Sequence, residues 1–275
     1  MAGILFLVGT PIGNLGDLSP RALEALWGAD FIAAEDTRVT LKLLTHFELK
    51  KPLVSYYEHN RAESGPRIVE RLLAGESCAL VTDAGMPAIS DPGEDLVRLC
   101  HEAGVEVRVI PGPSAAVSAL ALSGLPTGRF TFEGFLSVSK SARFEHLDSL
   151  RGEKRTMIFY EAPHKLRETL RDLLEVLGDR RIALCRELTK IHEETRRTTL
   201  GEALERIGSE PARGEYVIVV EGAQEGETAT ATTEEAVRLA RELRAGGMSL
   251  KDAAKRASQR TGIPKNVIYD AALDD

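Results

Sequence analysis

The sequence predicts an α/β protein with two α/β domains and a small C-terminal helical segment resembling a helix-turn-helix. Strand-like and helix-like runs alternate along residues 4–112 and again along 130–222. A small, polar stretch then precedes a run with helical spacing. In the first half, such alternation is typical of a mostly parallel sheet with helices on its faces. We therefore expect an N-terminal domain at 1–115, a C-terminal domain at 116–222, a linker at 223–232 and a helical tail at 233–275.

The first domain begins with the apolar strand "ILFLV" at residues 4–8. Ser19 and Pro20 then open a helix, because Ser is a favoured N-cap and Pro is favoured at the first helical position. Further strands are predicted at 30–35, 52–57, 77–83 and 106–112, and helices at 40–47, 61–76 and 93–104. A helix of small residues, 114–126, leads out of the domain.

The second domain follows the same pattern. Strands are predicted at 130–135, 155–161, 181–188 and 215–222, and helices at 142–150, 164–178 and 199–208. In the tail, Ser249 caps one helix and Pro264 opens the next, as in a helix-turn-helix.

Composition restricts the class of protein. The chain has 275 residues, 43% of them hydrophobic, and no apolar run approaches the ~20 residues of a membrane span, so we expect no membrane partner. Three scattered cysteines without metal-ligand spacing indicate reduced thiols in a cytoplasmic protein, with no metal or disulfide. The net charge of −7 argues against a general affinity for nucleic acid. Residues 140–197, however, carry 14 basic and 11 acidic side chains, so a polyanion would bind there or on the basic helix near the C-terminus.

A Gly/Pro loop, "GTPIGNLGDLSP", follows the first strand. Its glycines lack the GxGxxG spacing, and Pro11 has no N–H where a phosphate cradle needs a donor. Asp36 lies 20 residues beyond Gly16, where a dinucleotide fold places a ribose-binding carboxylate, so a nicotinamide enzyme is a weaker alternative.

Polar residues also follow the other strands of the first domain. Glu35, Asp36 and Arg38 come directly after a strand, and strand ends in open α/β sheets face ligand crevices. The alternative is that Asp36 caps the next helix and Arg38 is its surface partner. Ser114 also follows a strand and begins a helix. It either binds polar atoms of a ligand or acts only as the N-cap of that helix.

Eight strings occur in a fixed order: "GTPIGNLGDLSPRAL", "AEDTR", "VTDAGMPAISDPG", "PGPSA", "FTFEGF", "EAPHK", "CRELTKIHEE" and "GEYVIVVEG". Together they resemble the tetrapyrrole-methylase superfamily of S-adenosylmethionine-dependent methyltransferases, most closely its branch acting on ribosomal RNA. The similarity covers about residues 3–222, and the tail resembles the helical segment that this branch appends. The resemblance implies a cofactor cleft between the two domains, a homodimer, and methylation of a cytidine ribose 2′-hydroxyl in the decoding region of 16S rRNA in the small ribosomal subunit.

The resemblance also implies the residues of the site. For S-adenosylmethionine we expect contacts from Pro11, Asp83, Ala84, Gly85, Met86, Ile89, Ser114 and Ala115. Asp83 can accept hydrogen bonds from the amino-acid or ribose end, while Ala84 and Gly85 let the backbone approach the ligand. Pro87 and Pro92 would hold this loop in shape before the cofactor binds.

Catalysis needs positioning and help with a proton. The ribose hydroxyl is a poor nucleophile, so a base or a cation must act as its proton leaves. Asp36 and Glu35 are candidate bases, and Arg38 or Lys165 could steady a phosphate or a developing alkoxide. For RNA we expect phosphate contacts from Arg143, Arg151, Lys154 and Arg155, and from Lys251, Lys255, Arg256 and Arg260 on the tail helix.

Two other functions remain open. A methyltransferase of a small, corrin-type tetrapyrrole predicts an enclosed, arginine-lined cavity and no need of the tail. A non-enzymatic nucleic-acid-binding regulator built on the helix-turn-helix predicts no binding of S-adenosylmethionine.

Overall fold

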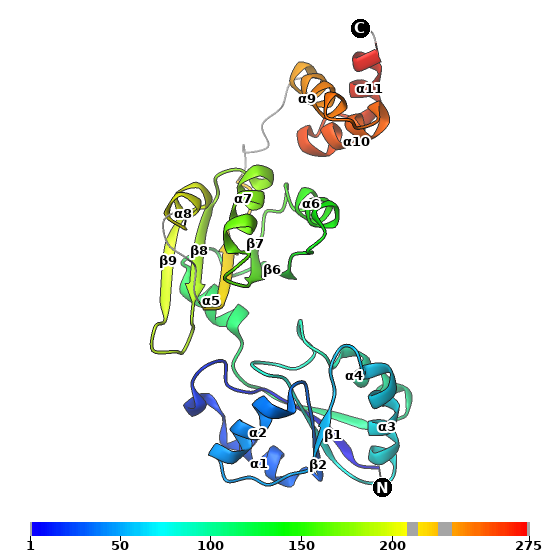
Figure 1. Ribbon diagram of the computed structural model, residues 1–275, viewed down its shortest axis with the longest axis vertical. Coiled ribbons are helices and arrows are strands. Elements are labelled where there is room, and N and C mark those ends of the chain that lie inside the picture. Colours follow the sequence, from blue (N-terminus) through cyan, green and yellow to red (C-terminus); the bar gives the residue numbers. More distant parts are fainter. Residues whose placement is uncertain (1, 208–213, 225–232, 274–275) are drawn as a thin grey trace. The chain divides into compact units, whose positions relative to one another are not determined.

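The computed structural model describes residues 2–207, 214–224 and 233–273 (Figure 1). The chain forms two compact units. Unit 1 comprises Met1–Ser118 and Glu187–Glu193, and unit 2 comprises Ala119–Arg186 and Glu194–Asp275. Most of the predicted linker, from residue 225 to 232, lies outside the described residues.

Unit 1 is built on a parallel sheet of five strands in the order β3-β2-β4-β1-β5. The strands are β1 (Ile4–Val8), β2 (Phe31–Ala34), β3 (Leu53–Ser55), β4 (Cys78–Val81) and β5 (Glu106–Ile110). The connecting helices are α1 (Pro20–Gly28), α2 (Thr37–His46), α3 (Arg61–Leu73) and α4 (Glu94–Glu102), with a short 3₁₀ turn η1 (Leu15–Asp17) and the exit helix α5 (Ala115–Ser123). The predicted parallel α/β class is therefore confirmed.

The helices of unit 1 cover both faces of its sheet. Side chains of β2 and β4 alternate between two apolar clusters, and both strands are buried along their whole length. Leu26 of α1 and Leu44 of α2 pack on one face, and Leu72 of α3 and Leu96 of α4 pack on the other. Because all five strands run in the same direction, their carboxyl ends meet at one edge of the sheet.

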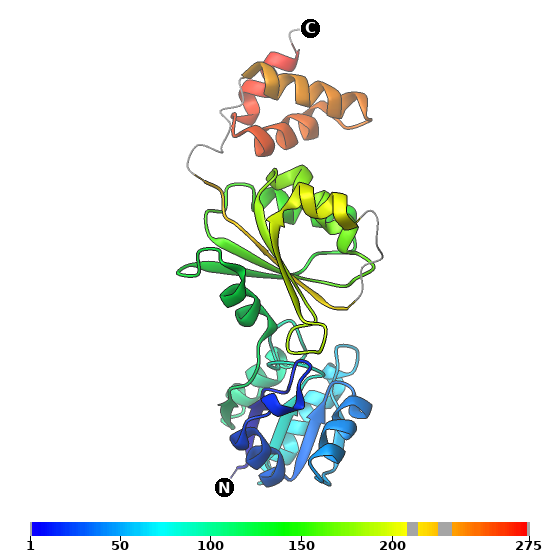
Figure 2. The ribbon, with the colours of Figure 1, turned by 90° about the vertical axis from the view of Figure 1, so that its left-hand side faces the viewer.

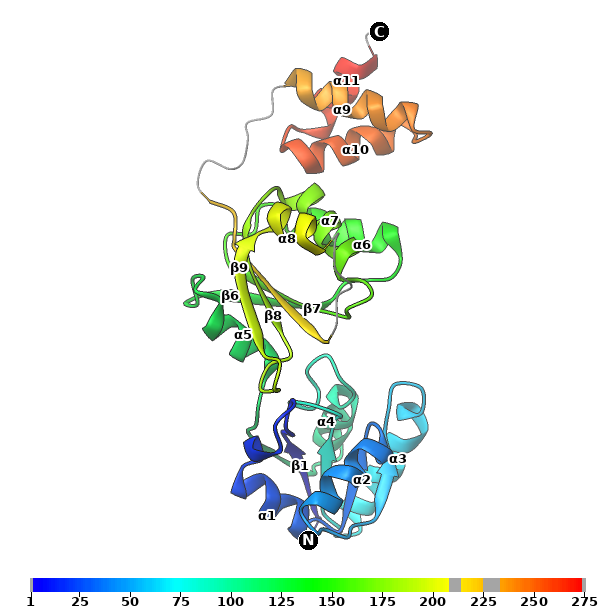
Figure 3. The same ribbon diagram turned by 60° about the vertical axis from the view of Figure 1, so that its left-hand side comes forward.

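Unit 2 contains a mixed five-stranded sheet in the order β6-β7-β10-β8-β9. Its strands are β6 (Phe130–Phe135), β7 (Thr156–Glu161), β8 (Arg181–Arg186), β9 (Glu194–Thr199) and β10 (Tyr216–Val220). Helices α6 (Lys140–Ser149), α7 (Leu166–Leu177) and α8 (Leu200–Ile207) pack on one face through a single apolar cluster (Figure 3).

Strand β9 is an element that the sequence pattern does not predict. Its sequence "ETRRTT" lacks apolar residues, and only the threonines favour a strand. It pairs antiparallel with β8 from Arg181↔Thr199 to Arg186↔Glu194 and forms one edge of the sheet. An edge strand needs fewer apolar side chains, which is why alternation fails to reveal it.

The tail is a bundle of three helices, α9 (Thr233–Ala245), α10 (Leu250–Thr261) and α11 (Lys265–Leu273) (Figure 2). They enclose a small core rich in alanine. The Ser249 hydroxyl accepts from the Asp252 N–H at 3.2 Å, so the predicted cap of α10 is present. Within the described residues, every helix is too short or too polar to cross a bilayer.

Candidate active site at the strand ends of unit 1

The loops that follow β1 and β4 are joined into one backbone platform. The Thr10 N–H donates to the Gly85 carbonyl at 2.9 Å, and the Gly85 N–H donates back to the Thr10 carbonyl at 3.1 Å. The buried Thr10 hydroxyl also donates to the Thr82 carbonyl at 3.2 Å. These bonds fix the two loops against each other, so any ligand meets a preformed surface.

Glycine lets three loops approach at this platform. A Cβ atom on Gly9 would lie 2.6 Å from both the Gly112 Cα and the Met86 sulfur, so the ends of β1 and β5 pack backbone to backbone. Gly85 has a φ of +88°, which a side-chain-bearing residue rarely adopts. The position of its absent Cβ lies 3.6 Å from Ile12 and 3.7 Å from the Pro113 carbonyl. Gly85 is itself buried, so this turn packs the loop after β4 against its neighbours and fixes its course.

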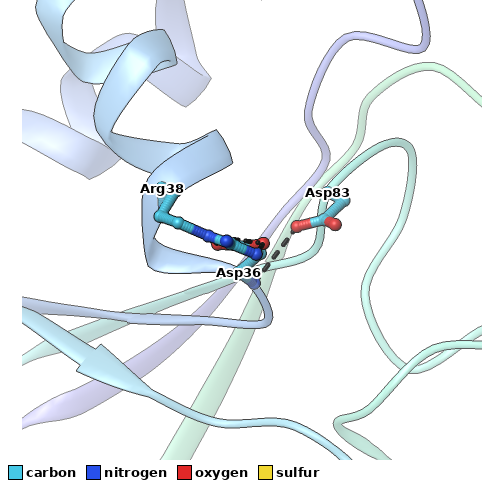
Figure 4. Close-up of polar contacts among 3 residues, drawn as sticks. All are labelled: Asp36, Arg38 and Asp83. Carbon is cyan, nitrogen blue, oxygen red and sulfur yellow. Dashed lines mark hydrogen bonds and ion pairs between the residues drawn. The ribbon is translucent and has the colours of Figure 1, made fainter.

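Carboxylates at the ends of β2 and β4 are tied to each other through backbone N–H groups. The Asp36 N–H donates to Asp83 Oδ1 at 3.1 Å (Figure 4), and the Asp83 N–H donates to Glu35 Oε2 at 3.3 Å. Two acidic loops from neighbouring strands are thus held side by side.

Asp36 also caps helix α2. Its Oδ1 accepts from the Arg38 N–H at 2.8 Å, and its carboxylate binds the Arg38 guanidinium through contacts of 3.0 and 2.6 Å (Figure 4). These hydrogen bonds from Arg38 lower the pKa of Asp36 to about 2. Asp36 is therefore the N-cap of α2, as the alternative prediction states. A carboxylate with so low a pKa is a weak proton acceptor.

The pKa values of the neighbouring carboxyls Glu35, Asp83 and Asp91 are raised, in contrast to that of Asp36. Burial raises the pKa of Glu35, and burial followed by the charge of Asp36 raises the pKa of Asp83. Burial and then the charges of Glu35 and Asp83 raise the pKa of Asp91 to about 7. Negative charge is crowded at this edge, and a cationic ligand would relieve the repulsion.

The loop after β4 has an unusual backbone. Ala88 and Ser90 have φ values of 68° and 61°, in the left-handed region that non-glycine residues seldom occupy. The Ala88 N–H donates to the Pro92 carbonyl at 3.3 Å and closes the turn. Strained residues of this kind persist where the surroundings hold them, often at ligand sites.

Comparison with known proteins identifies this arrangement. The model of the Tetrapyrrole (Corrin/Porphyrin) Methylases matches residues 5–204, and that of the RsmI C-terminal HTH domain matches 230–275. Proteins named Ribosomal RNA small subunit methyltransferase I from Synechocystis sp. and Bacillus subtilis are 46% and 45% identical to this chain. They cover 99% and 98% of it, and 98% and 94% of their own lengths. The chain belongs to the tetrapyrrole methylase family, in its ribosomal RNA small subunit methyltransferase I group.

Solved structures with low sequence identity have the same fold. A uroporphyrin-III-C-methyltransferase from Thermus thermophilus aligns with a TM-score of 0.56 at 22% identity, covering 80% of this chain and 94% of its own. A diphthine synthase aligns with a TM-score of 0.61 at 17% identity, covering 80% and 90%. As a member of the family, the chain is an S-adenosylmethionine-dependent methyltransferase.

The strand ends of unit 1 fit this cofactor. Asp83, Ala84 and Ile89 are exposed in the same loop, and Ile89 is 54% exposed. The Asp83 carboxylate can accept hydrogen bonds from an ammonium group or ribose hydroxyls, and Ile89 provides apolar surface. Gly85 is buried and bonded to Thr10, so it holds this loop in shape. The crowded carboxyls favour the positive charge of a sulfonium.

The structure brings most of the predicted cofactor residues together. Pro11 adjoins Thr10, which pairs with Gly85, and the Met86 sulfur lies against Gly9. Half-buried Ser114 and Ala115 begin α5, where the Val117 N–H lies 3.5 Å from the Ser114 hydroxyl. All of these residues lie within unit 1.

The predicted residues of unit 2 have different environments. Lys165 is half-buried just before α7. Arg143 is only 4% exposed, and its guanidinium pairs with Asp172 at 2.8 Å and with Glu168. This placement corrects the expectation that Arg143 contacts RNA, because its charge is committed to internal carboxylates.

The remaining basic residues of the predicted RNA set lie nearer the surface. Arg151 pairs with Asp148 at 3.1 Å, and Arg155 pairs with Glu153 at 2.6 Å. Lys154 and Lys255 are exposed, and Arg256 is half-buried. The side chain of Arg260 lies outside the described residues.

Proposed function

We propose that this methyltransferase transfers a methyl group from S-adenosylmethionine to the 2′-hydroxyl of a cytidine ribose in the decoding region of 16S rRNA. The observation that carries the proposal is the match of residues 230–275 to the RsmI C-terminal HTH domain, joined to near full-length relatives named for small-subunit ribosomal RNA. The substrate would be the small ribosomal subunit, and the enzyme would act in the cytoplasm.

The tail favours RNA over a corrin-type tetrapyrrole. The solved structure named for uroporphyrin methylation covers 80% of this chain. A small tetrapyrrole gives the additional helices no evident role. In contrast, the segment from Arg244 to Tyr269 contains six basic side chains and one acidic side chain, a balance that suits a polyanion.

Methyl transfer requires mainly that the enzyme position its two substrates. When bound, S-adenosylmethionine supplies a methyl group on a sulfonium, which an oxygen nucleophile displaces in line. In our proposal Asp83 accepts hydrogen bonds from the cofactor, and the joined loops at Thr10 and Gly85 hold it in place. Glu35, whose pKa is raised by burial, is a better proton acceptor than Asp36.

Cations would assist at the acceptor. The Arg38 side chain is 86% exposed while Asp36 fixes its guanidinium, so it can present N–H donors to a phosphate or a developing alkoxide. Lys165 is the second candidate for this role. The homodimer implied by the family resemblance stays a prediction, which light scattering on the purified enzyme would test.

Further RNA contacts are proposed for exposed and half-buried basic side chains of unit 2. They are Arg151, Lys154, Arg155, Lys251, Lys255 and Arg256. In the tail, a concavity of about 390 Å³ is lined by Lys251, Lys265, Asn266, Tyr269 and Asp270. Its two lysines and one aromatic ring are groups that bind phosphates and bases.

The decisive experiment is methyl transfer from tritiated S-adenosylmethionine to small subunits isolated from cells that lack the enzyme. Nucleoside analysis should place the label in a 2′-O-methylated cytidine derivative. Absence of label from the subunits, with the cofactor still bound by the enzyme, would contradict the proposal and favour the tetrapyrrole alternative.

Variants of the catalytic candidates sharpen this test. Asp36→Ala and Lys165→Ala should each lose turnover while S-adenosylmethionine still binds. The hydrogen bond from Asp36 to Asp83 survives in Asp36→Ala because its donor is the backbone N–H. Asp36→Ala would act by releasing the Arg38 guanidinium that Asp36 fixes, and loss of a hydrogen bond to a charged group costs about 10–100-fold. Calorimetric titration and single-turnover assays separate binding from chemistry, with Arg98→Ala on the exposed face of α4 as the control. Normal turnover in both variants would remove these residues from the catalytic set.

A further inference from the structure

Unit 2 contains a pocket of about 330 Å³ between strands β8, β9 and β10 and helix α8. Its lining includes Arg186, Glu194, Arg196, Glu202, Arg206 and Tyr216. Three arginines and two glutamates have side chains on this face of the sheet or on α8, so the lining has an excess of positive charge. We call this feature the arginine pocket.

The strand register explains why these side chains converge. Tyr216 of β10, Arg186 of β8 and Glu194 of β9 form one row across the sheet, and Leu184 and Arg196 lie in the adjacent row on the same face. Leu184 and Ala203 belong to the apolar cluster, which places this face on the side of the sheet that α8 covers. Arginines from β8, β9 and α8 therefore meet at one place.

The ion pairs in the pocket do not neutralise all of its positive charge. Glu194 is shared by two arginines, pairing with Arg186 at 3.3 Å and also with Arg196. Arg197 lies on the opposite face of β9, where its guanidinium donates to the carbonyls of Ser123, at 3.2 Å, and Leu122 in α5, so its charge lies outside the pocket. One carboxylate between two guanidiniums leaves a net attraction for an anion.

One donor in the pocket lacks an acceptor. The Nε atom of Arg186 is buried and has no hydrogen-bond partner among the described residues. A buried N–H without an acceptor is unfavourable by about 1–3 kcal/mol, and such groups in native proteins call for a bound water, ion or ligand. An anionic oxygen in the pocket would satisfy this donor.

We propose that the arginine pocket binds a phosphodiester group of the RNA substrate. The proposal rests on the function proposed above and gives it a specific subsite. Guanidinium groups match phosphate oxygens in a bidentate geometry, and the Tyr216 ring provides an aromatic wall for a sugar or base. The volume lies at the small end of the roughly 300–1,000 Å³ range of ligand sites, which suits part of a nucleotide better than a macrocycle.

The pocket differs from the other basic residues of unit 2 in its charge balance. Arg151 and Arg155 each have a neighbouring carboxylate of their own, and Arg143 has two. Charged side chains on an edge strand such as β9 can also serve only to prevent strand-to-strand association. The experiment must therefore distinguish phosphate binding from protection of the edge.

The test compares Arg196→Gln and Arg206→Gln with the control Arg181→Gln. Arg181 lies on β8 as well, but on the opposite face and beside Glu221, so its substitution makes the same charge change outside the pocket. Arg206 is exposed on α8, so its variant should fold even if Arg196→Gln does not. Melting temperature and S-adenosylmethionine affinity are measured for each variant.

In the methyl-transfer assay on small subunits, each pocket variant should raise KM about tenfold while kcat and cofactor affinity stay unchanged. With a short fluorescent single-stranded RNA, the slope of log affinity against log salt should fall by about 0.7 for each lost phosphate contact. The control should match the wild type in both assays.

The outcomes separate this proposal from the function it rests on. Unchanged KM and salt slope in both pocket variants, with normal methylation, would overturn the arginine pocket alone. If wild-type enzyme binds RNA through these arginines but does not methylate subunits, the pocket stands and the proposed reaction fails. Equal losses in the pocket variants and the control would also refute a specific subsite.

Discussion

The two sheets of this enzyme concentrate opposite charges. In unit 1 the parallel strands end at one edge, where Glu35, Asp83 and Asp91 crowd together with raised pKa values. In unit 2 the arginines of the mixed sheet gather around Glu194. The first arrangement attracts a cation such as a sulfonium, and the second attracts a polyanion. The overall charge of −7 conceals this division, so the location of charge is more informative than its sum.

The same contrast holds for single ion pairs. Arg143 and Asp172 in unit 2 have side chains that are 5% and 3% exposed, whereas Arg38 and Asp36 in unit 1 are 86% and 26% exposed. A buried charge without its partner is strongly destabilising, while an exposed pair has little effect on stability. We therefore expect the buried pair to maintain the fold and the exposed pair to serve the site.

The largest predicted effect comes from breaking the buried pair. Asp172→Ala should lower the free energy of unfolding by about 3–5 kcal/mol, because Arg143 then retains only its partly exposed partner Glu168. Urea denaturation measures the change, and Arg38→Ala should leave the midpoint almost unchanged. The double variant Arg143→Met with Asp172→Leu should regain much of the stability. A double variant as unstable as Asp172→Ala would show that packing, and not the unpaired charge, causes the loss.

The second prediction concerns the acidic edge of unit 1. Asp83→Asn keeps an oxygen for the Asp36 N–H but removes a negative charge, so affinity for S-adenosylmethionine should fall about 10–100-fold. Titration calorimetry measures the affinity. Glu106→Gln makes the same charge change at the amino end of β5, away from the carboxyl ends where the site lies. It should not change the affinity for S-adenosylmethionine. Equal affinities for wild type and Asp83→Asn would remove Asp83 from the cofactor site.

The third prediction tests the close contact of the two glycines. Gly9→Ala places a methyl group 2.6 Å from the Gly112 Cα, so it should destabilise unit 1 by about 1–3 kcal/mol and weaken cofactor binding by distorting the platform. Gly28→Ala, where no atom lies within 4 Å of the added carbon, should be neutral or slightly stabilising. Denaturation and calorimetry on both variants distinguish the contact from a general effect of replacing glycine.

The sequence predicts much of unit 1 because its strands and helices have strong local patterns. Buried parallel strands such as "CALV" and capped helices such as the one after Ser19 are determined by nearby residues, and the structure contains them. The cofactor loops follow such strands directly, so their convergence could be anticipated. What could not be anticipated is the pairing of their N–H groups and carboxylates, which depends on strand order.

Unit 2 shows where sequence patterns fail. Strand β9 has no apolar alternation, so the basic residues Arg196 and Arg197 read as a polar loop. Arg143 lies in a basic stretch, and only the packing of α6 on α7 reveals that it is buried between carboxylates. Charge counted along the chain located the positive segment but not the residues that present the charge.

The smallest predicted effect tests the charge contrast without a mutation. Burial and the neighbouring acids raise the pKa of Asp91 to about 7, so this carboxyl is largely protonated in the free enzyme at pH 6. A cationic ligand stabilises its ionised form, and binding therefore releases a proton. Affinity for S-adenosylmethionine should rise a few-fold from pH 6 to pH 8 and then level off. Calorimetry in buffers of different ionisation enthalpy detects the released proton.

Asp91→Asn provides the control for this pH dependence. It should abolish the step near pH 7 and leave only a shallower change at lower pH from Glu35 and Asp83, whose pKa values burial also raises. The neutral product S-adenosylhomocysteine lacks the sulfonium charge and should show a smaller step than the cofactor. If both ligands bind with the same pH profile, the acidic edge recognises their common amino group, and the sulfonium is not what the crowded carboxyls select.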